Sequence, residues 1–189
     1  MTDTTTTTSG ISTWNIDKAH SSIDFAVKHM MFSTVKGRFG EFSGEINLDD
    51  QNLPDSSVNV EIQTSSIDTR DAGRDGHLAS PDFFDAEKFP TITFTSTDVE
   101  AAKDDEFKVS GDLTLHGITK QVVMTVEQTG RGMSPFGFPV TGFSATTKIS
   151  RKEFGLEWNA ALETGGVLVG DDIKISIEIE ANPAVAKEA

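Results

Sequence analysis

Strict alternation of apolar and polar residues is the feature that most constrains what this chain can fold into. In DDIKISIEIE, isoleucine occupies every second position from 173 to 179, and lysine, serine and glutamate stand between. Successive side chains of a strand point to opposite faces, so this strand has one buried and one solvated face. Such strands are typical of antiparallel sheets and barrels, because strands of parallel sheets are apolar on both faces. The sequence therefore predicts an all-β protein.

The same alternation recurs along the chain and indicates about eight strands in total. The other seven segments lie within residues 21–30, 43–48, 57–64, 91–97, 107–117, 120–128 and 141–150. Turn-forming residues separate them, among them Asp104-Asp105, as expected of all-β architecture. A closed barrel is favoured over an open sandwich, since closure removes exposed strand edges. Gly111 interrupts one apolar row and predicts either a bulge or a close backbone approach.

Helix is predicted at only two places, within residues 69–94 and at residues 156–163. In TRDAGRDGHL, Gly73 and Gly76 weaken any helix, so one or two short turns are expected. Ser80-Pro81-Asp82 then provides an N-cap, a first-turn proline and a first-turn acid for a second short turn. The segment is predicted to form a lid whose apolar side chains face inward beneath charged ones.

The composition excludes several classes of function. The chain has 189 residues, enough for one domain, with 16 Lys and Arg against 30 Asp and Glu and a net charge of −14. So acidic a surface argues against general binding of nucleic acid, and against attraction to an anionic membrane. There is no cysteine, which excludes disulfides and thiolate chemistry. No run of about 18 apolar residues is present, so no integral membrane segment is expected.

The ends of the chain are predicted to lie outside the folded domain. Residues 1–12 are rich in threonine and are expected to form a disordered tail, residues 13–182 the barrel, and residues 183–189 a C-terminal tail. The first residues lack the basic start and apolar run of a secretory signal. A cytoplasmic protein is therefore expected.

Several long motifs resemble one protein family. RDGHLASPDFFDAEKFPTITF is similar to the most characteristic motif of the YceI-like family of lipocalin-like lipid-binding proteins. WNIDKAHSSIDFAVKHMMFSTVKGRFGEFSGEI resembles its opening strands, GDLTLHGITKQVVM its central hairpin, and SRKEFGLEW and VGDDIKISIEIEA its closing segments. The resemblance runs from about Trp14 to Ala181, with the motifs in family order.

The resemblance implies an extended eight-stranded antiparallel lipocalin-like barrel with an apolar tunnel and short helical turns at one end. Relatives hold polyisoprenoid or fatty-acid-like lipids in the tunnel and tend to be dimers, so such a lipid and a homodimer are the expected partners. Many relatives are exported, whereas this chain shows no export signal. This departure from the family leaves the biological ligand open. Nine residues are predicted to line the tunnel because each sits mid-strand on an apolar face: Phe25, Val27, Phe42, Val60, Ile62, Phe94, Leu113, Phe143 and Ile175. Phe83 and Phe84 are predicted to line and close its end.

Four polar residues admit two interpretations. His20, Arg74, Asp75 and His77 either clamp the lid through ion pairs and caps, or meet the polar head of a lipid, for which an arginine fork is well suited. The clamp is favoured. The four histidines of the chain show no zinc-ligand spacing, so they are expected to hydrogen-bond turns and carboxylates, with no metal and no cofactor.

Three functions remain open at this point. The leading hypothesis is non-enzymatic binding, sequestration or transport of an isoprenoid or long-chain acyl lipid. The second is an enzyme acting on a lipid head group at the barrel mouth, which requires His20, Asp75 and His77 to converge in one cleft. The third is an interaction module with a filled barrel, dimerising through an apolar patch at residues 156–168.

Overall fold

The computed structural model describes residues 10–103 and 106–184, which form eleven strands, one α-helix and four short 3-10 helices. The strands are β1 (Ile11–Ile16), β2 (Ser22–His29), β3 (Ser33–Phe39), β4 (Phe42–Asp49), β5 (Ser57–Gln63), β6 (Ile67–Asp68), β7 (Thr91–Ala101), β8 (Glu106–Leu115), β9 (Ile118–Met133), β10 (Pro139–Ser150) and β11 (Val169–Pro183). The helices are α1 (Ala72–Ala79), η1 (Lys18–His20), η2 (Leu53–Asp55), η3 (Thr64–Ser66) and η4 (Arg151–Phe154).

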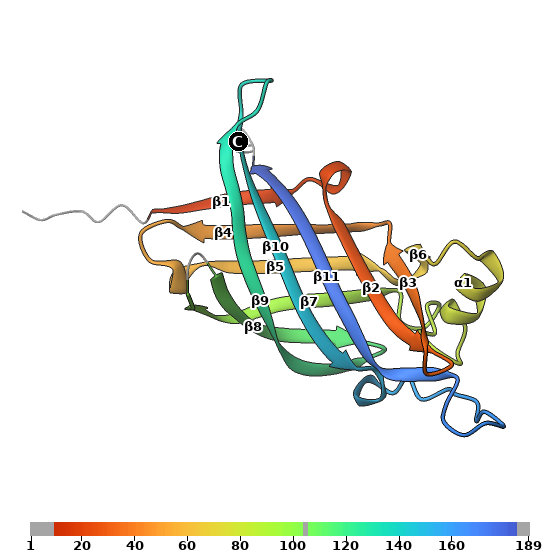
Figure 1. Cartoon of the computed structure of the whole chain (residues 1–189). Coiled ribbons are helices and arrows are strands. Elements are labelled where there is room, and N and C mark those ends of the chain that lie inside the picture. Colours follow the sequence, from red (N-terminus) through yellow and green to blue (C-terminus); the bar gives the residue numbers. More distant parts are fainter. Residues whose placement is uncertain (1–9, 104–105, 185–189) are drawn as a thin grey trace, which may run out of the picture.

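Eight antiparallel strands close into a barrel in the order β1-β4-β5-β7-β8-β9-β10-β11, and pairing of β1 with β11 completes the ring. The remaining strands, β2, β3 and β6, extend the sheet from β11 toward the end of the molecule that carries α1 (Figure 1). The predicted all-β class and the eight-stranded antiparallel barrel are confirmed.

One edge of β11 is shared by two strands in succession. Residues from Val169 to Glu178 pair with β2, and residues from Ala181 to Pro183 pair with β1. The short helix η1 separates β1 from β2, so that β1 turns toward β4 and β2 toward β3. The strands predicted from alternation therefore included β2 and missed β1, because Ile11 lies on one face of β1 and Trp14 and Ile16 lie on the other. They also missed β3 and β6, because Gly37 interrupts the row of β3 and β6 has only two residues.

The segment after β6 forms the predicted short helical turns. Asp71 caps α1 by accepting a hydrogen bond from the backbone N–H of Arg74 at 2.9 Å. The chain then turns again, with Phe83 N–H donating to the carbonyl of Ser80 at 3.0 Å. This places the phenylalanines at 83 and 84 over one end of the barrel.

The helix predicted at residues 156–163 is wrong, because this segment has no regular secondary structure apart from a bridge at Ala161. A helix would bond its carbonyl groups to its own N–H groups. Here the carbonyls of Leu156 and Trp158 instead accept hydrogen bonds from Nη1 of Arg151. The side chain of Asn159 bonds both the N–H and the carbonyl of Val169, which holds the segment extended beside β11.

Both alternatives predicted for Gly111 occur next to each other. A Cβ atom at this position would lie 2.4 Å from Cζ of Phe94, so only glycine lets that ring lie flat on β8. The partner strand β7 carries a bulge between Ser96 and Asp98, directly beside Gly111. The approach of Phe94 to the backbone fixes the ring in the barrel interior.

The predictions for the tails at residues 1–12 and 183–189 fall mainly outside the described residues, as does the turn at Asp104-Asp105. Where the chain is described, β1 begins at Ile11 and β11 ends at Pro183. Within the described residues, no helix has the length and apolar character needed to cross a membrane.

Candidate functional site

An elongated apolar cavity of about 280 Å³ lies inside the barrel. It extends from Leu53 and Gln128 at one end to Phe83 and Leu156 at the other. The isoleucine row of β11 forms one wall, and at about 3.3 Å per residue its six-residue span covers roughly 20 Å. The volume is near the lower end of small-molecule pockets, about 300–1,000 Å³. The wall residues thus come from both ends of the barrel.

The few polar side chains on the cavity wall form hydrogen bonds with other groups of the protein. Oγ1 of Thr147 donates to the carbonyl of Val123 at 2.8 Å, and Nε of Arg151 donates to the carbonyl of Gly170 at 2.9 Å. At the far end, Nε2 of Gln128 donates to Thr141. The wall therefore favours burial of an apolar ligand and provides few partners for a polar group.

Ten of the eleven residues predicted to line the tunnel lie on the cavity wall: Phe25, Val27, Val60, Ile62, Phe83, Phe84, Phe94, Leu113, Phe143 and Ile175. Phe42 does not. It is the first residue of β4 rather than a mid-strand residue, and its ring is buried in the core cluster with Phe39 and Ile67. A contact of the ten wall residues with a ligand remains a proposal.

The sequence analysis left out other residues on the same wall. Those on the apolar rows of the predicted strands are Ile23, Ile46, Leu48, Val58, Ile92, Phe107, Val109, Leu115, Val122, Met124, Val126, Ala145, Thr147, Ile149, Ile173, Ile177 and Ile179. The alternation that selected Phe143 or Ile175 places these neighbours on the same face, so the signal was present. Arg151 carried no such signal, because its position depends on contacts with distant segments.

Arg74 and Asp75 converge on the buried residue Thr69, at the start of the lid. Asp75 Oδ1 accepts hydrogen bonds from the N–H of Thr69 at 2.8 Å and from its hydroxyl at 2.5 Å. Arg74 donates from Nε to Oγ1 of Thr69 at 2.7 Å and from Nη2 to its carbonyl at 2.8 Å. These contacts fit the clamp interpretation, while contact with a ligand head group stays a proposal.

His77 links α1 to the segment after η4. Its Nε2 lies 2.9 Å from Oδ2 of Asp82, and its ring meets Phe83 and Trp158 edge to face with centroid distances of 5.1 and 4.8 Å. Since Phe83 lines the cavity, His77 holds one of the residues that close its end. It contacts no side chain of η1 or of β11 near Glu180 in the described hydrogen bonds and ring contacts.

The structure does not bring His20 to the other three polar residues. His20 lies in η1, the short turn between β1 and β2, whereas α1 lies at the end beyond β3 (Figure 1). Its Nδ1 lies 2.8 Å from Oδ2 of Asp17 and 3.8 Å from Oε1 of Glu180. These three residues could offer a metal ion one ligand atom each, but the His20 side chain is exposed and its Nδ1 already bonds Asp17. His20 and His77 therefore belong to two separate places.

The hydrogen bond between His20 and Asp17 shifts the pKa values of the two groups in opposite directions. It lowers the pKa of Asp17 and raises the pKa of His20 above its ordinary value of 6.5. The stabilisation from His20 is present below 6.5 and is lost as the pH rises through its raised pKa. That from Asp17 is present above 3.8 and is lost as the pH falls through its lowered pKa. The pair therefore stabilises the fold in mildly acidic solution.

We expect Asp17→Asn to lower the pKa of His20 toward 6.5, because the carboxylate that stabilises the imidazolium is removed. An NMR titration of the His20 ring protons measures this shift. Glu180→Gln is the matched control and should have a smaller effect, since Glu180 lies 3.8 Å from the ring and makes no hydrogen bond to it. An unchanged titration of His20 in Asp17→Asn would contradict the assignment.

Comparison with known proteins identifies the family. The family model described as the YceI-like domain matches residues 14–181. The chain belongs to the YceI-like family. A UPF0312 protein of Vibrio cholerae serotype O1 is 45% identical over 139 residues, which cover 74% of each chain. The solved structure of the Campylobacter jejuni YCEI protein has a TM-score of 0.72 at 34% identity and covers 84% of this chain and 90% of that one.

A more distant structure shares only the fold. This is a polyisoprenoid binding domain from Saccharophagus degradans, with a TM-score of 0.66 and 15% identity, covering 90% of this chain and 98% of that chain. The YceI-like resemblance noted from the sequence motifs is thus confirmed over nearly the whole chain.

Proposed function

We propose that this YceI-like protein binds one isoprenoid or long-chain acyl lipid inside the barrel and sequesters or carries it, without catalysing a reaction. The observation that carries the proposal is the elongated cavity of about 280 Å³, whose wall is apolar and whose polar residues are bonded to the protein. In the proposal, the ten wall residues named above contact the chain, and Phe83 and Phe84 close one end.

Burial of the lipid supplies the affinity in this proposal. Each methylene removed from water contributes about 0.8 kcal/mol, so ten contribute roughly 8 kcal/mol before the cost of ordering the chain. A wall with few free hydrogen-bonding groups distinguishes chains by length and width and has little effect on which head group is attached. The Saccharophagus degradans domain, described as polyisoprenoid binding, supports the view that this fold can hold such a chain.

The two alternatives receive less support. An enzyme at the barrel mouth requires His20, Asp75 and His77 in one cleft, whereas Asp75 bonds Thr69 and His20 lies beside Glu180. A filled barrel would leave no elongated cavity. The proposal also includes a homodimer, which sedimentation tests. It includes a cytoplasmic location, which cell fractionation tests.

Extraction of the purified protein tests the proposal. The protein is purified without detergent, extracted with organic solvent and examined by mass spectrometry, beside an unrelated acidic protein prepared from the same cells. We expect one lipid per chain that is absent from the control, or an empty protein that takes up one added isoprenoid alcohol or fatty acid. A clean protein that refuses both classes of lipid would overturn the proposal.

A further inference from the structure

Four apolar side chains are exposed together at the end of the barrel that carries α1. Met30, Met31 and Phe32 form the loop between β2 and β3, with exposures of 38%, 60% and 76%, and Val167 is 40% exposed. The side chain of Met31 packs against Gly166, and the N–H of Met30 donates to the carbonyl of Leu168 at 2.8 Å. The loop and Val167 thus form one surface, here named the apolar tip.

The residue types in this loop are not those that its backbone favours. Met30 and Met31 have φ angles of 52° and 69°, in the left-handed region. Hairpin loops of this kind usually place Asn, Asp or Gly at such positions, since bulky side chains are strained there. Formation of the turn therefore does not explain two methionines at these strained and exposed positions.

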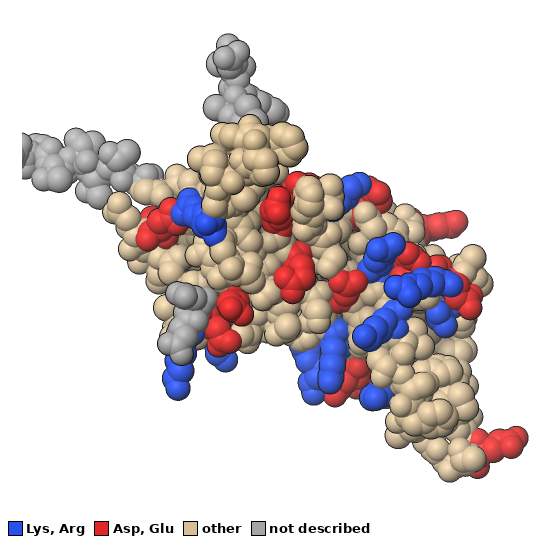
Figure 2. Space-filling view, turned by 45° about the horizontal axis from the view of Figure 1, so that its top comes forward, with Lys and Arg blue, Asp and Glu red and all other residues tan. Residues whose placement is uncertain are grey.

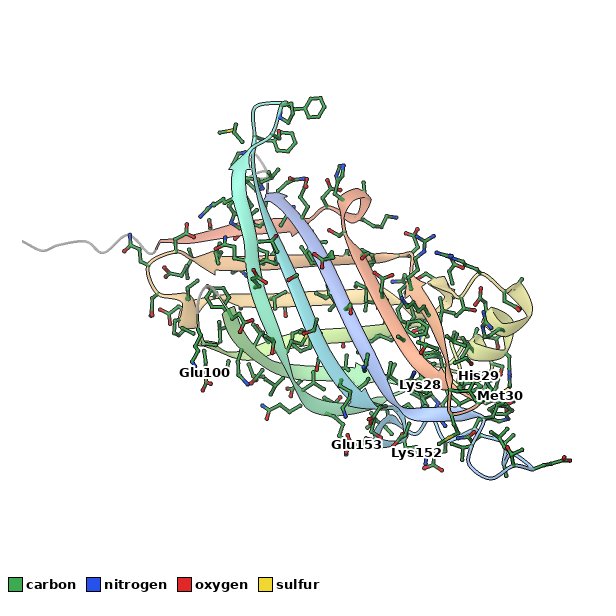
Figure 3. All side chains as sticks on the ribbon, viewed as in Figure 1. Lys28, His29, Met30, Glu100, Lys152 and Glu153 are labelled. Carbon is green, nitrogen blue, oxygen red and sulfur yellow. The ribbon has the colours of Figure 1, made fainter. Side chains whose placement is uncertain are left out.

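Lysines surround the apolar tip on the outer face of the sheet. Since Phe25 and Val27 face the cavity, Lys28 faces outward, as do Lys36 and Lys174, which both stand opposite Ala26. At about 3.3 Å per residue, these lysines lie about 7–14 Å along the strands from the tip. Lys152 on η4 lies at the same end of the molecule as Lys28 and Met30 (Figure 3).

These four lysines take part in no ion pair within 4.0 Å among the described residues, although acids outnumber bases in the chain by 30 to 16. The acids Asp68 and Asp172 pair with Arg38 and Lys148, and Asp171 accepts hydrogen bonds from the hydroxyl of Ser150 and from the backbone N–H of Lys152. Figure 2 shows most of the visible Lys and Arg side chains in the right half of this face, together with Asp and Glu side chains, above a mostly tan bulge that ends in acidic side chains. With a screening length of about 8 Å in physiological salt, a surface that touches the tip responds mainly to these local lysines.

The apolar tip is continuous with the cavity wall. Val27 and Val169 both line the cavity. Val27 lies three residues before Met30, and Val169 lies two residues after Val167. β2 and β11 therefore connect the interior to the exposed loop, with His29 between Val27 and the tip on the cavity-facing side of β2. The lid residue Phe83 lies at this same end of the cavity.

We propose that the apolar tip, with Lys28, Lys36, Lys152 and Lys174, is a docking surface for a lipid bilayer that contains anionic lipids. The apolar side chains enter the interface and the lysines meet the anionic head groups, as in other peripheral membrane proteins. Four side chains are too few for the roughly 800 Å² that each partner buries in a standard protein interface. Docking in this orientation turns the lid end of the cavity toward the membrane.

The test measures binding to vesicles of phosphatidylcholine alone and of phosphatidylcholine with phosphatidylglycerol, by flotation of the whole protein. We expect binding only with phosphatidylglycerol, and weaker binding in high salt. Met30→Asn with Met31→Gly should weaken binding at least tenfold while raising the melting temperature by about 2–4 °C, because these residues suit the left-handed turn. Opposite changes in binding and stability separate docking from a role in folding.

The chain provides a matched control at another hairpin. Met133 and Phe136 are 69% and 86% exposed at the tip between β9 and β10, where residues 132–147 carry no charge. Serine at both positions should leave vesicle binding unchanged, whereas Lys28→Glu with Lys174→Glu should abolish it.

Three results would overturn the docking proposal. The first is no binding to either kind of vesicle, and the second is an equal loss of vesicle binding in the variant with serine at 133 and 136. The third is a dimer in sedimentation that Met30→Asn with Met31→Gly dissociates without weakening vesicle binding. The last result would assign the tip to a second copy of the chain. Uptake of a soluble lipid by the same samples is scored separately, so a failure of docking is distinguishable from a failure of lipid binding.

Discussion

Ala145→Phe is expected to weaken binding of a long-chain lipid more than a hundredfold while the protein stays folded. Ala145 lies on the cavity wall in β10, between Val126 of β9 and Ile177 of β11. A phenyl ring at this position would obstruct a narrow cavity of about 280 Å³. If four methylenes can no longer be buried, about 3 kcal/mol of affinity is lost.

The stability of this variant should change little. The ring enters open space rather than a packed core and brings no polar atom, so we expect a change in the free energy of unfolding below about 2 kcal/mol. Titration calorimetry with a fatty acid or isoprenoid alcohol measures binding, and urea unfolding measures stability. A charged substitution in the cavity would mix the two effects, which is why an apolar one is chosen.

Thr146→Phe is the matched control. Thr146 is the next residue of β10 and is exposed on the outer face, so the same ring is added outside the barrel. Lipid binding by this variant should equal that of the unchanged protein. Full binding by Ala145→Phe, or equal loss in both variants, would contradict the placement of the lipid in the cavity.

Long strands with regular alternation of apolar and polar residues were predicted correctly. The isoleucine row of β11 is long and regular, so it fixed both the strand and the face that lines the cavity. β1 has apolar residues on both faces and so shows no alternation, and the row of β3 is interrupted at Gly37, where a Cβ atom would lie 2.4 Å from the ring of Phe25. A missing side chain that accommodates a distant ring leaves no local signal.

The apolar tip shows a second limit of the sequence pattern. Met30 follows β2 without a Gly, Pro or Asn to mark a turn, so the strand was predicted to continue through it. The hairpin became visible only from the pairing of His29 with Ser33 and from the left-handed φ angles. A local rule fails here at residues for which we infer a function, as expected where function and turn preference conflict.

Arg151 shows a third limit, because its role depends on segments far along the chain. Its side chain is 2% exposed and donates to the carbonyls of Gly170, Leu156 and Trp158. Read locally, LEWNAALE after η4 has good helix formers, and these predicted a helix. The arginine takes the carbonyl groups that such a helix would need, so a tertiary contact overrides the local preference.

Arg151→Met is therefore expected to lower the free energy of unfolding by about 3–5 kcal/mol. Methionine keeps the apolar stem but leaves the three carbonyl groups without their donors, and each buried unsatisfied group costs about 1–3 kcal/mol. Water can reach the partly buried carbonyls, which keeps the total below the sum of the largest values. Denaturation in urea, followed by circular dichroism, measures the loss.

Two variants separate the hydrogen bonds of Arg151 from its charge. Arg151→Lys retains the positive charge but lacks the planar fork, so it should restore less than half of the lost stability. Lys152→Met removes a neighbouring exposed charge and should change the free energy of unfolding by less than about 0.5 kcal/mol. If Arg151→Met were as stable as Lys152→Met, the segment after η4 would be held by its apolar contacts with Phe83 and the core. Arg151 would then contribute nothing that a methionine could not.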